Sequence, residues 1–178
     1  MKRVATTAFV FASLLAAPSF GAMKPGDTAP VFTAQAAAGG EEFTFSLADA
    51  LKKGPVVLYF FPKAFTKGCT AEAHGFAEAA GRFKAAGATL IGMSADDIST
   101  LHKFSTQECS AKFPVAADPE LKVIKSYDTV LTTKSGATVA DRISYVIRQD
   151  GKIAYSFASL DPDKHVENTL AEVKKLQK

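Results

Sequence analysis

Metal-binding and redox-active side chains are scarce in this sequence, which has two cysteines and three histidines among 178 residues. Structural zinc sites need about four Cys or His ligands, usually in pairs a few residues apart. Cys69 and Cys109 lie far apart in the chain, and no second cysteine or histidine pair accompanies either of them. The spacing therefore argues against a zinc site, and we expect no bound metal.

The sequence also lacks a strong net charge and a cluster of basic residues. Its formal net charge is +3, but two of the 21 basic residues, Lys2 and Arg3, lie within residues 1–21, which contain no acidic residue. The rest of the chain is therefore almost neutral. Because nucleic-acid-binding domains carry basic patches, we expect no nucleic-acid partner.

No apolar run reaches the length of about 20 residues that a membrane-spanning helix needs. The chain starts with two positive residues, a short apolar segment at residues 8–17 and small residues up to Ala22, which is the pattern of a secretory signal peptide. We place the signal peptide at residues 1–21 and a single domain at residues 22–178. We therefore expect no membrane span in the mature protein, and export, most naturally to a bacterial periplasm.

Strand and helix signals alternate along this domain. Residues 56–61 are all apolar, as expected for a strand buried on both faces of a sheet. Predicted strands cover residues 31–35, 42–45, 56–61, 88–94, 113–117, 142–148 and 152–157, and predicted helices cover residues 47–53, 69–86, 99–108, 119–127 and those from Pro162 onward. This order predicts an α/β fold with a mixed sheet, helices on both faces and an N-terminal β-hairpin.

The most informative residue is Cys69, which follows the buried strand and a short turn and stands at the start of a predicted helix. The first N–H groups of a helix have no partner inside the helix, and its dipole adds a partial positive charge there. Thiols in such settings have pKa values of about 3.5–7.5, against about 8.5 for a free thiol. The sequence therefore predicts a reactive thiolate.

Simpler interpretations of the same residues remain open. Cys69 could be an inert buried cysteine, or it could form a structural disulfide with Cys109, which would stabilise the fold by roughly 4 kcal/mol in the chain-entropy model. Thr66 could serve only as a helix N-cap. Arg142 could be a strand residue in a surface ion pair. The three histidines are expected to face solvent or to pack rather than to act as ligands.

The spacing Pro62-x-x-x-Thr66-x-x-Cys69 resembles the active-site signature of the peroxiredoxins. The surrounding residues are most similar to the bacterioferritin-comigratory, or Q-type, branch of that family. Further matches to that branch are Gly26 to Pro30, Ser94 to Asp96, Phe113-Pro114, Asp118-Pro119, Arg142 and Asp150-Gly151. The resemblance covers essentially all of residues 22–178, and it implies a thioredoxin-like α/β sandwich and thiol-dependent peroxidase activity without metal, haem or flavin.

The resemblance also implies roles for individual residues. Arg142 and Thr66 would line the peroxide pocket as hydrogen-bond donors, together with the backbone N–H groups at Gly68 and at the thiol. Pro62 would shield the sulfur from water, and Glu72 would orient the arginine. These hydrogen-bond donors are needed because ionisation of the thiol alone gives only a limited gain in rate. A free thiol is already about 3% ionised at pH 7, so complete ionisation raises the reactive fraction by about thirtyfold at most.

The chain departs from the Q-type pattern at one position. Many members carry a second cysteine five residues after the first, where this chain has His74. Other members place the partner cysteine in the middle region, so Cys109 is the candidate resolving cysteine. The implied cycle forms a sulfenic acid at Cys69, then a Cys69–Cys109 disulfide, which a thioredoxin-like protein or a small thiol reduces. The branch is often monomeric, and we expect a monomer.

Two other functions compete with peroxide reduction. A thioredoxin-fold protein thiol-disulfide oxidoreductase usually needs Cys-x-x-Cys, but the residue three positions after Cys69 is Glu72. A non-enzymatic binding domain would hold an inert structural disulfide with a low reduction potential. Reaction with hydrogen peroxide distinguishes the peroxidase from both.

Overall fold

The computed structural model describes residues 21–177, so the predicted signal peptide lies outside the described residues apart from Gly21. The strands are β1 (Thr33–Ala38), β2 (Glu41–Ser46), β3 (Val56–Phe60), β4 (Thr89–Ser94), β5 (Val115–Ala117), β6 (Val130–Thr132), β7 (Thr138–Ala140), β8 (Ile143–Ile147) and β9 (Ile153–Ala158). The helices are α1 (Leu47–Leu51), α2 (Lys67–Ala85), α3 (Ile98–Gln107), α4 (Lys122–Ser126) and α5 (Pro162–Lys175). No helix in this part of the chain is both long and apolar enough to span a bilayer.

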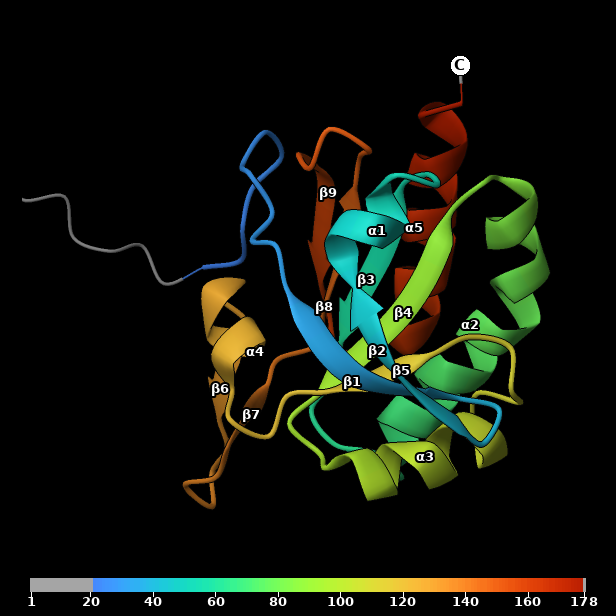
Figure 1. The fold of residues 1–178 in the computed structure, drawn as a ribbon. Helices are drawn as coiled ribbons and strands as arrows, with labels where there is room; N and C mark the ends of the chain where they lie inside the picture. The colour runs from blue at the N-terminus through green and yellow to red at the C-terminus, as the bar shows by residue number, and fades with distance from the viewer. Residues whose placement is uncertain (1–20, 178) are drawn as a thin grey trace, which may run out of the picture.

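Seven strands form one mixed sheet in the order β2-β1-β5-β4-β3-β8-β9 (Figure 1). β3 lies near its centre, parallel to β4 and antiparallel to β8. The predicted N-terminal hairpin is present as β1 and β2, and it extends the sheet because β1 also pairs antiparallel with β5. The predicted α/β fold with a mixed sheet is therefore confirmed.

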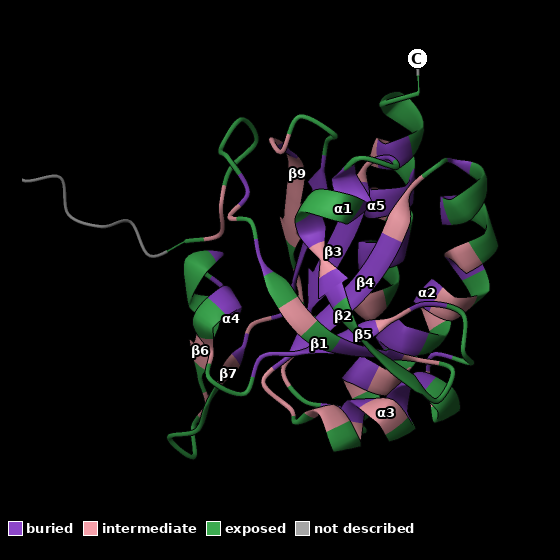
Figure 2. Ribbon diagram, viewed as in Figure 1, coloured by how far each residue is buried: buried purple, intermediate pink, exposed green. Residues whose placement is uncertain are grey.

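Helices cover both faces of this sheet. Burial of β3 on both sides explains why polar and apolar residues do not alternate in its sequence. Val56, Leu58 and Phe60 face a core that also contains apolar residues of α1 and α4. Val57 and Tyr59 face the opposite core, which contains the apolar sides of α2, α3 and α5. Because side chains alternate along a strand, burial of both faces requires an apolar residue at every position. Figure 2 shows β3 and β4 as the buried centre of the molecule.

Packing between α2 and α5 explains the glycine in the middle of α2. A Cβ atom added at Gly75 would lie 3.2 Å from Cγ2 of Val166, so the glycine lets the two helices approach closely. The next residue, Phe76, stacks on Tyr59 of β3, with ring centroids 4.4 Å apart. Gly75 costs about 1 kcal/mol of helix propensity, and these contacts hold the helix in place.

The β6–β7 hairpin was not predicted from the sequence. Each strand has three residues, and the turn between them contains Gly136 at a φ of 84°. Three residues are too few to show an alternating pattern. The hairpin forms a separate two-stranded sheet that immediately precedes Arg142 in the chain.

Candidate active site

The turn between β3 and α2 is fixed to the end of β4. The Phe61 N–H donates to the Met93 carbonyl at 3.0 Å, which continues the sheet pairing by one residue. The Ala64 N–H donates to the Asp96 carboxylate at 2.7 Å, and the Ser94 hydroxyl donates to the same oxygen at 2.8 Å. Asp96 therefore positions the turn that leads to the thiol. In the sequence, Asp96 was noted only as part of a motif match.

The last residues of this turn adopt the conformation that starts the helix. Phe65 has a φ of 63°, which is costly for a bulky side chain, and its ring packs edge-on against Phe104. Thr66 is the extended N-cap residue of α2, but its side chain makes no capping hydrogen bond. Its hydroxyl donates to the Lys63 carbonyl at 2.9 Å. Because this hydrogen is committed, Thr66 can offer lone pairs to a ligand, whereas we expected a donor.

Cys69 lies in the first turn of α2 and is buried, with 1% of its surface exposed. The Arg142 guanidinium reaches it from the residue before β8, and its Nη2 donates to Sγ at 3.3 Å. The sulfur therefore lies at a helix start, where N–H groups lack partners inside the helix, and contacts a permanent cation. Both features stabilise negative charge on the sulfur and on an oxygen beside it.

Gly68 makes this approach possible. A Cβ atom added at Gly68 would lie 3.1 Å from Nη2 of Arg142, so the guanidinium lies directly against the helix backbone. Any other residue at this position would displace Arg142 by a few tenths of an ångström. The glycine therefore lets Arg142 contact Cys69 without such a displacement.

Replacing Gly68 by alanine should lower the rate constant for oxidation of Cys69 by hydrogen peroxide by roughly three- to tenfold, because small misplacements of catalytic groups are costly. Gly81→Ala is the matched control on the same helix, since an added Cβ there meets nothing within 4 Å. Stopped-flow measurement of both variants checks this. Equal rates for Gly68→Ala and the wild type would contradict it.

Glu72 holds Arg142 from the opposite side. Nη1 of Arg142 donates to Oε2 of Glu72, and both side chains are buried. Burial raises the pKa of Glu72, whereas the charge and hydrogen bond of the adjoining Arg142 lower it and favour the ionised carboxylate. The guanidinium is thus shared between a carboxylate and a thiol, with one terminal nitrogen for each. This fixes its plane relative to the sulfur.

Cys109 lies just beyond the C-terminus of α3 and is fully buried. Both cysteines are free, so the structure contains no Cys69–Cys109 disulfide. Burial raises the pKa of the Cys109 thiol, with a further contribution from Glu108. Nε2 of His74 contacts Oε2 of Glu108 at 2.8 Å and so links α2 to the end of α3. Cys109 must leave this environment before it can react as a thiolate.

The structure thus brings together Gly68, Cys69, Glu72 and Arg142, as expected. Pro62 is half-buried, two residues before the Ala64 N–H that Asp96 binds.

A cavity of about 690 Å³ is lined by Asp141 and Ile143, the residues on either side of Arg142, but not by Cys69. A hydroperoxide with few heavy atoms needs no cavity of that size.

The sequence indicated only that His165 faces solvent or packs, and sequence reasoning did not find its polar contacts. Its side chain is fully buried, and both ring nitrogens have partners, the Ser144 hydroxyl and the Ser159 carbonyl. One signal was available. His165 and Thr169 stand four residues apart, beside the apolar residues Val166 and Leu170, so they share the buried side of α5.

Comparison with known proteins agrees with this geometry. The model of the AhpC/TSA family matches residues 25–156. A chloroplastic peroxiredoxin Q of Sedum lineare is 30% identical over 159 residues, which cover 89% of this chain and 82% of the relative. A chloroplastic peroxiredoxin Q of Triticum aestivum is 32% identical over 157 residues, which cover 88% of this chain and 69% of the relative.

Solved structures give the same result for the fold. The crystal structure of peroxidoxin BcpB from Mycobacterium tuberculosis superposes with a TM-score of 0.79 at 28% identity, covering 88% of this chain and 99% of that one. A PrxQ mutant from Xylella fastidiosa also gives 0.79, covering 89% and 99%, and at 22% identity it shows the fold alone. The chain has the thioredoxin-like fold of these proteins, and it belongs to the AhpC/TSA family of peroxiredoxins.

Proposed function

We propose that this protein is a thiol-dependent peroxidase that reduces hydrogen peroxide and small organic hydroperoxides at Cys69. The observation that carries the proposal is the 3.3 Å contact between Nη2 of Arg142 and Sγ of Cys69, which joins residues 73 positions apart in the chain. A single cation that touches the sulfur can also contact a small molecule bound to that sulfur. Family membership supports the same activity.

In the first step the Cys69 thiolate attacks the terminal oxygen of the hydroperoxide along the O–O axis. A sulfur–oxygen bond forms and the O–O bond breaks, which leaves a sulfenic acid on Cys69 and an alkoxide or hydroxide. The departing oxygen takes a proton and becomes an alcohol or water. Negative charge grows on that oxygen in the transition state, where Arg142 and the N–H groups at the start of α2 stabilise it.

Thr66 has a complementary role in this proposal. Its hydroxyl hydrogen is held by the Lys63 carbonyl, so its oxygen accepts the hydrogen bond of the peroxide O–H group. Arg142 donates and Thr66 accepts, so together they orient the two ends of the peroxide differently. Pro62 limits the access of water on the side of the preceding turn.

In the second step Cys109 condenses with the sulfenic acid to form a disulfide with loss of water. A thioredoxin-like protein or a small thiol then reduces this disulfide. We propose that this cycle operates in a monomer after export to a periplasm and removal of residues 1–21. The mass of the mature protein recovered from its source tests the cleavage, and its sedimentation tests the monomer.

The proposed activity is tested by mixing the reduced protein with one equivalent of hydrogen peroxide and following the mass of Cys69 peptides. We expect a sulfenic acid, trapped by a sulfenic-specific reagent, or a Cys69–Cys109 disulfide within seconds. A Cys69→Ser variant serves as the control and should consume no peroxide. If the Cys69 thiol persists for minutes, the chain is not a peroxidase.

A further inference from the structure

His165 is a buried polar group that the proposed chemistry does not use. It lies in the first turn of α5, with Nε2 at 2.9 Å from the Ser159 carbonyl and Nδ1 at 2.8 Å from the Ser144 hydroxyl. The Phe157 ring packs edge-on against it at a centroid distance of 4.9 Å. A buried side chain with all its polar atoms engaged has a single defined orientation.

The partners of His165 also fix its protonation state. The Ser159 carbonyl can only accept a hydrogen bond, so Nε2 carries the hydrogen. Burial and the nearby charge of Arg142 both lower the pKa of His165, although the Ser159 carbonyl opposes them, so the ring is neutral. Nδ1 then has only a lone pair, and it accepts the hydrogen of the Ser144 hydroxyl.

This neutral ring faces the free side of Glu72. Nδ1 of His165 lies 3.7 Å from Oε1 of Glu72, and Oε1 has no hydrogen-bond partner among the described residues. The other carboxylate oxygen, Oε2, accepts from Arg142. The side of Glu72 that faces α5 is therefore filled by a group that offers it no hydrogen, so Arg142 is the one donor to this carboxylate in the described chain.

We propose that His165 is a positioning residue for the peroxidase reaction, because it acts through Glu72 to keep Arg142 against Cys69. This inference rests on the proposed function. The chain of contacts runs from the Ser144 hydroxyl through the His165 ring and the Glu72 carboxylate to the guanidinium and the thiol. It couples the start of α5 to the start of α2, two elements that are far apart in sequence.

Two changes would break this arrangement. A proton on Nδ1 would let the ring donate to Oε1 and draw the carboxylate away from Arg142. Loss of the Ser144 hydrogen would leave the Nδ1 lone pair free to accept a hydrogen from a protonated Glu72. The charged groups around the ring are Glu72 of α2, Asp141 and Arg142 before β8, and Asp161 at the N-cap of α5.

His165→Gln separates this role from a structural one. The glutamine amide can still donate to the Ser159 carbonyl, but it removes the ring that faces Glu72. We expect the rate constant for oxidation of Cys69 by hydrogen peroxide to fall about tenfold or more, because a small shift of Arg142 misplaces the reacting groups. A wild-type rate in a folded His165→Gln variant would overturn the proposal.

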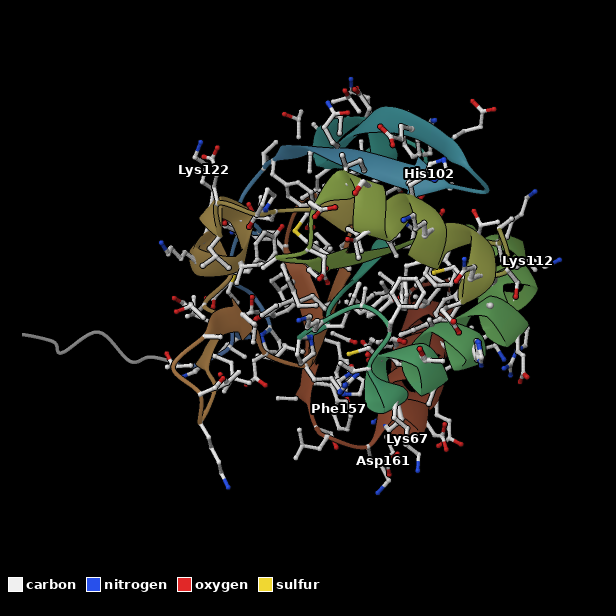
Figure 3. The ribbon with its side chains drawn as sticks, turned by 90° about the horizontal axis from the view of Figure 1, so that it is seen from below. Lys67, His102, Lys112, Lys122, Phe157 and Asp161 are labelled. Carbon is white, nitrogen blue, oxygen red and sulfur yellow. The ribbon has the colours of Figure 1, made fainter. Side chains whose placement is uncertain are left out.

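His102→Gln is the matched control. Nε2 of His102 also contacts a backbone carbonyl, that of Gly40, at 2.7 Å. In the view of Figure 3 His102 lies on the opposite side of the molecule from Phe157, the ring that packs on His165. This variant should keep the wild-type rate. An equal loss in both variants would mean that the effect is not specific to His165.

A double-mutant cycle with Glu72→Gln tests the route of the effect. If His165 acts through Glu72, His165→Gln should cause no further loss of rate in the Glu72→Gln background. Multiplicative losses would show an independent, structural effect and would overturn the proposal. Ser144→Ala should also lower the rate constant, and it should cause no further loss in the Glu72→Gln background. This variant provides a second test if His165→Gln does not fold. A wild-type protein inert to peroxide would instead refute the proposed function itself.

Discussion

Replacing Arg142 by methionine should lower the rate constant for oxidation of Cys69 by hydrogen peroxide by about 10²–10³-fold, the usual loss when one donor to a developing oxyanion is removed. Methionine fills a similar volume but carries neither charge nor hydrogen-bond donor. The donor that now lies 3.3 Å from the sulfur would be lost, and no other cation is bonded to Cys69 in the described chain. Rapid mixing with peroxide, monitored by trapping the remaining thiol, measures this rate.

The fold needs a separate control, because Arg142→Met alone leaves the Glu72 carboxylate buried without its partner. Removal of one member of a buried ion pair costs about 3–5 kcal/mol of stability. The double variant Arg142→Met, Glu72→Gln removes the unpaired charge and should recover much of that stability without recovering the rate. Arg148→Met is the matched control, since Arg148 pairs with Asp150 at the surface. A wild-type rate in the Arg142→Met variant would remove Arg142 from the site.

Replacing Cys109 by serine should preserve the first oxidation of Cys69 and abolish the disulfide that follows it. The wild type should form a Cys69–Cys109 disulfide after one equivalent of peroxide, whereas Cys109→Ser should stop at the sulfenic acid. With excess peroxide the variant should proceed to the sulfinic acid, which ordinary thiols do not reduce. Peptide mass mapping before and after addition of a dithiol distinguishes these products.

The structure of the segment after α3 gives the physical reason for a separate resolving step. Cys109 is buried, and the following residues, Ser110 and Ala111, both have positive φ values of 49° and 56°. Left-handed conformations cost roughly 1–2 kcal/mol for residues other than glycine, so local opening of this segment releases strain. The contact between His74 and Glu108 opposes that opening. If Cys109→Ser turns over with a dithiol as fast as the wild type, an external thiol resolves Cys69 and this account of Cys109 is wrong.

The local parts of the fold were predictable from the sequence because they depend on neighbouring residues. The apolar run 56–61 predicted a strand buried on both faces, and the helix predicted from residue 47 begins there because Ser46, a favoured N-cap type, accepts from the Asp49 N–H at 3.2 Å. The position of Cys69 at a helix start followed in the same way. Each of these features is determined by residues less than about six positions apart.

The long-range parts were not predictable from residue patterns. Nothing in the local sequence of Arg142 indicates that it contacts Cys69, and only the resemblance to peroxiredoxins suggested it. The anchoring of Ala64 by Asp96 and the contact of His165 with Glu72 join elements that meet only in the folded sheet. The hydrogen bond of Thr66 was not predictable for a related reason, because the turn geometry directs its hydroxyl to the Lys63 carbonyl.

We infer that this site accelerates cleavage of a peroxide bond and does more than hold a thiolate. This is tested most directly by comparing the rate constants of Cys69 with hydrogen peroxide and with an alkylating agent, each relative to a small free thiolate. Alkylation reports only on the exposure and ionisation of the thiol, and relative to a free thiolate ionisation adds no rate while burial of the sulfur can only lower it. We predict that the peroxide reaction exceeds that of the free thiolate by orders of magnitude, whereas alkylation does not. Equal enhancement factors for the two reagents would show that the site does no more than hold a thiolate.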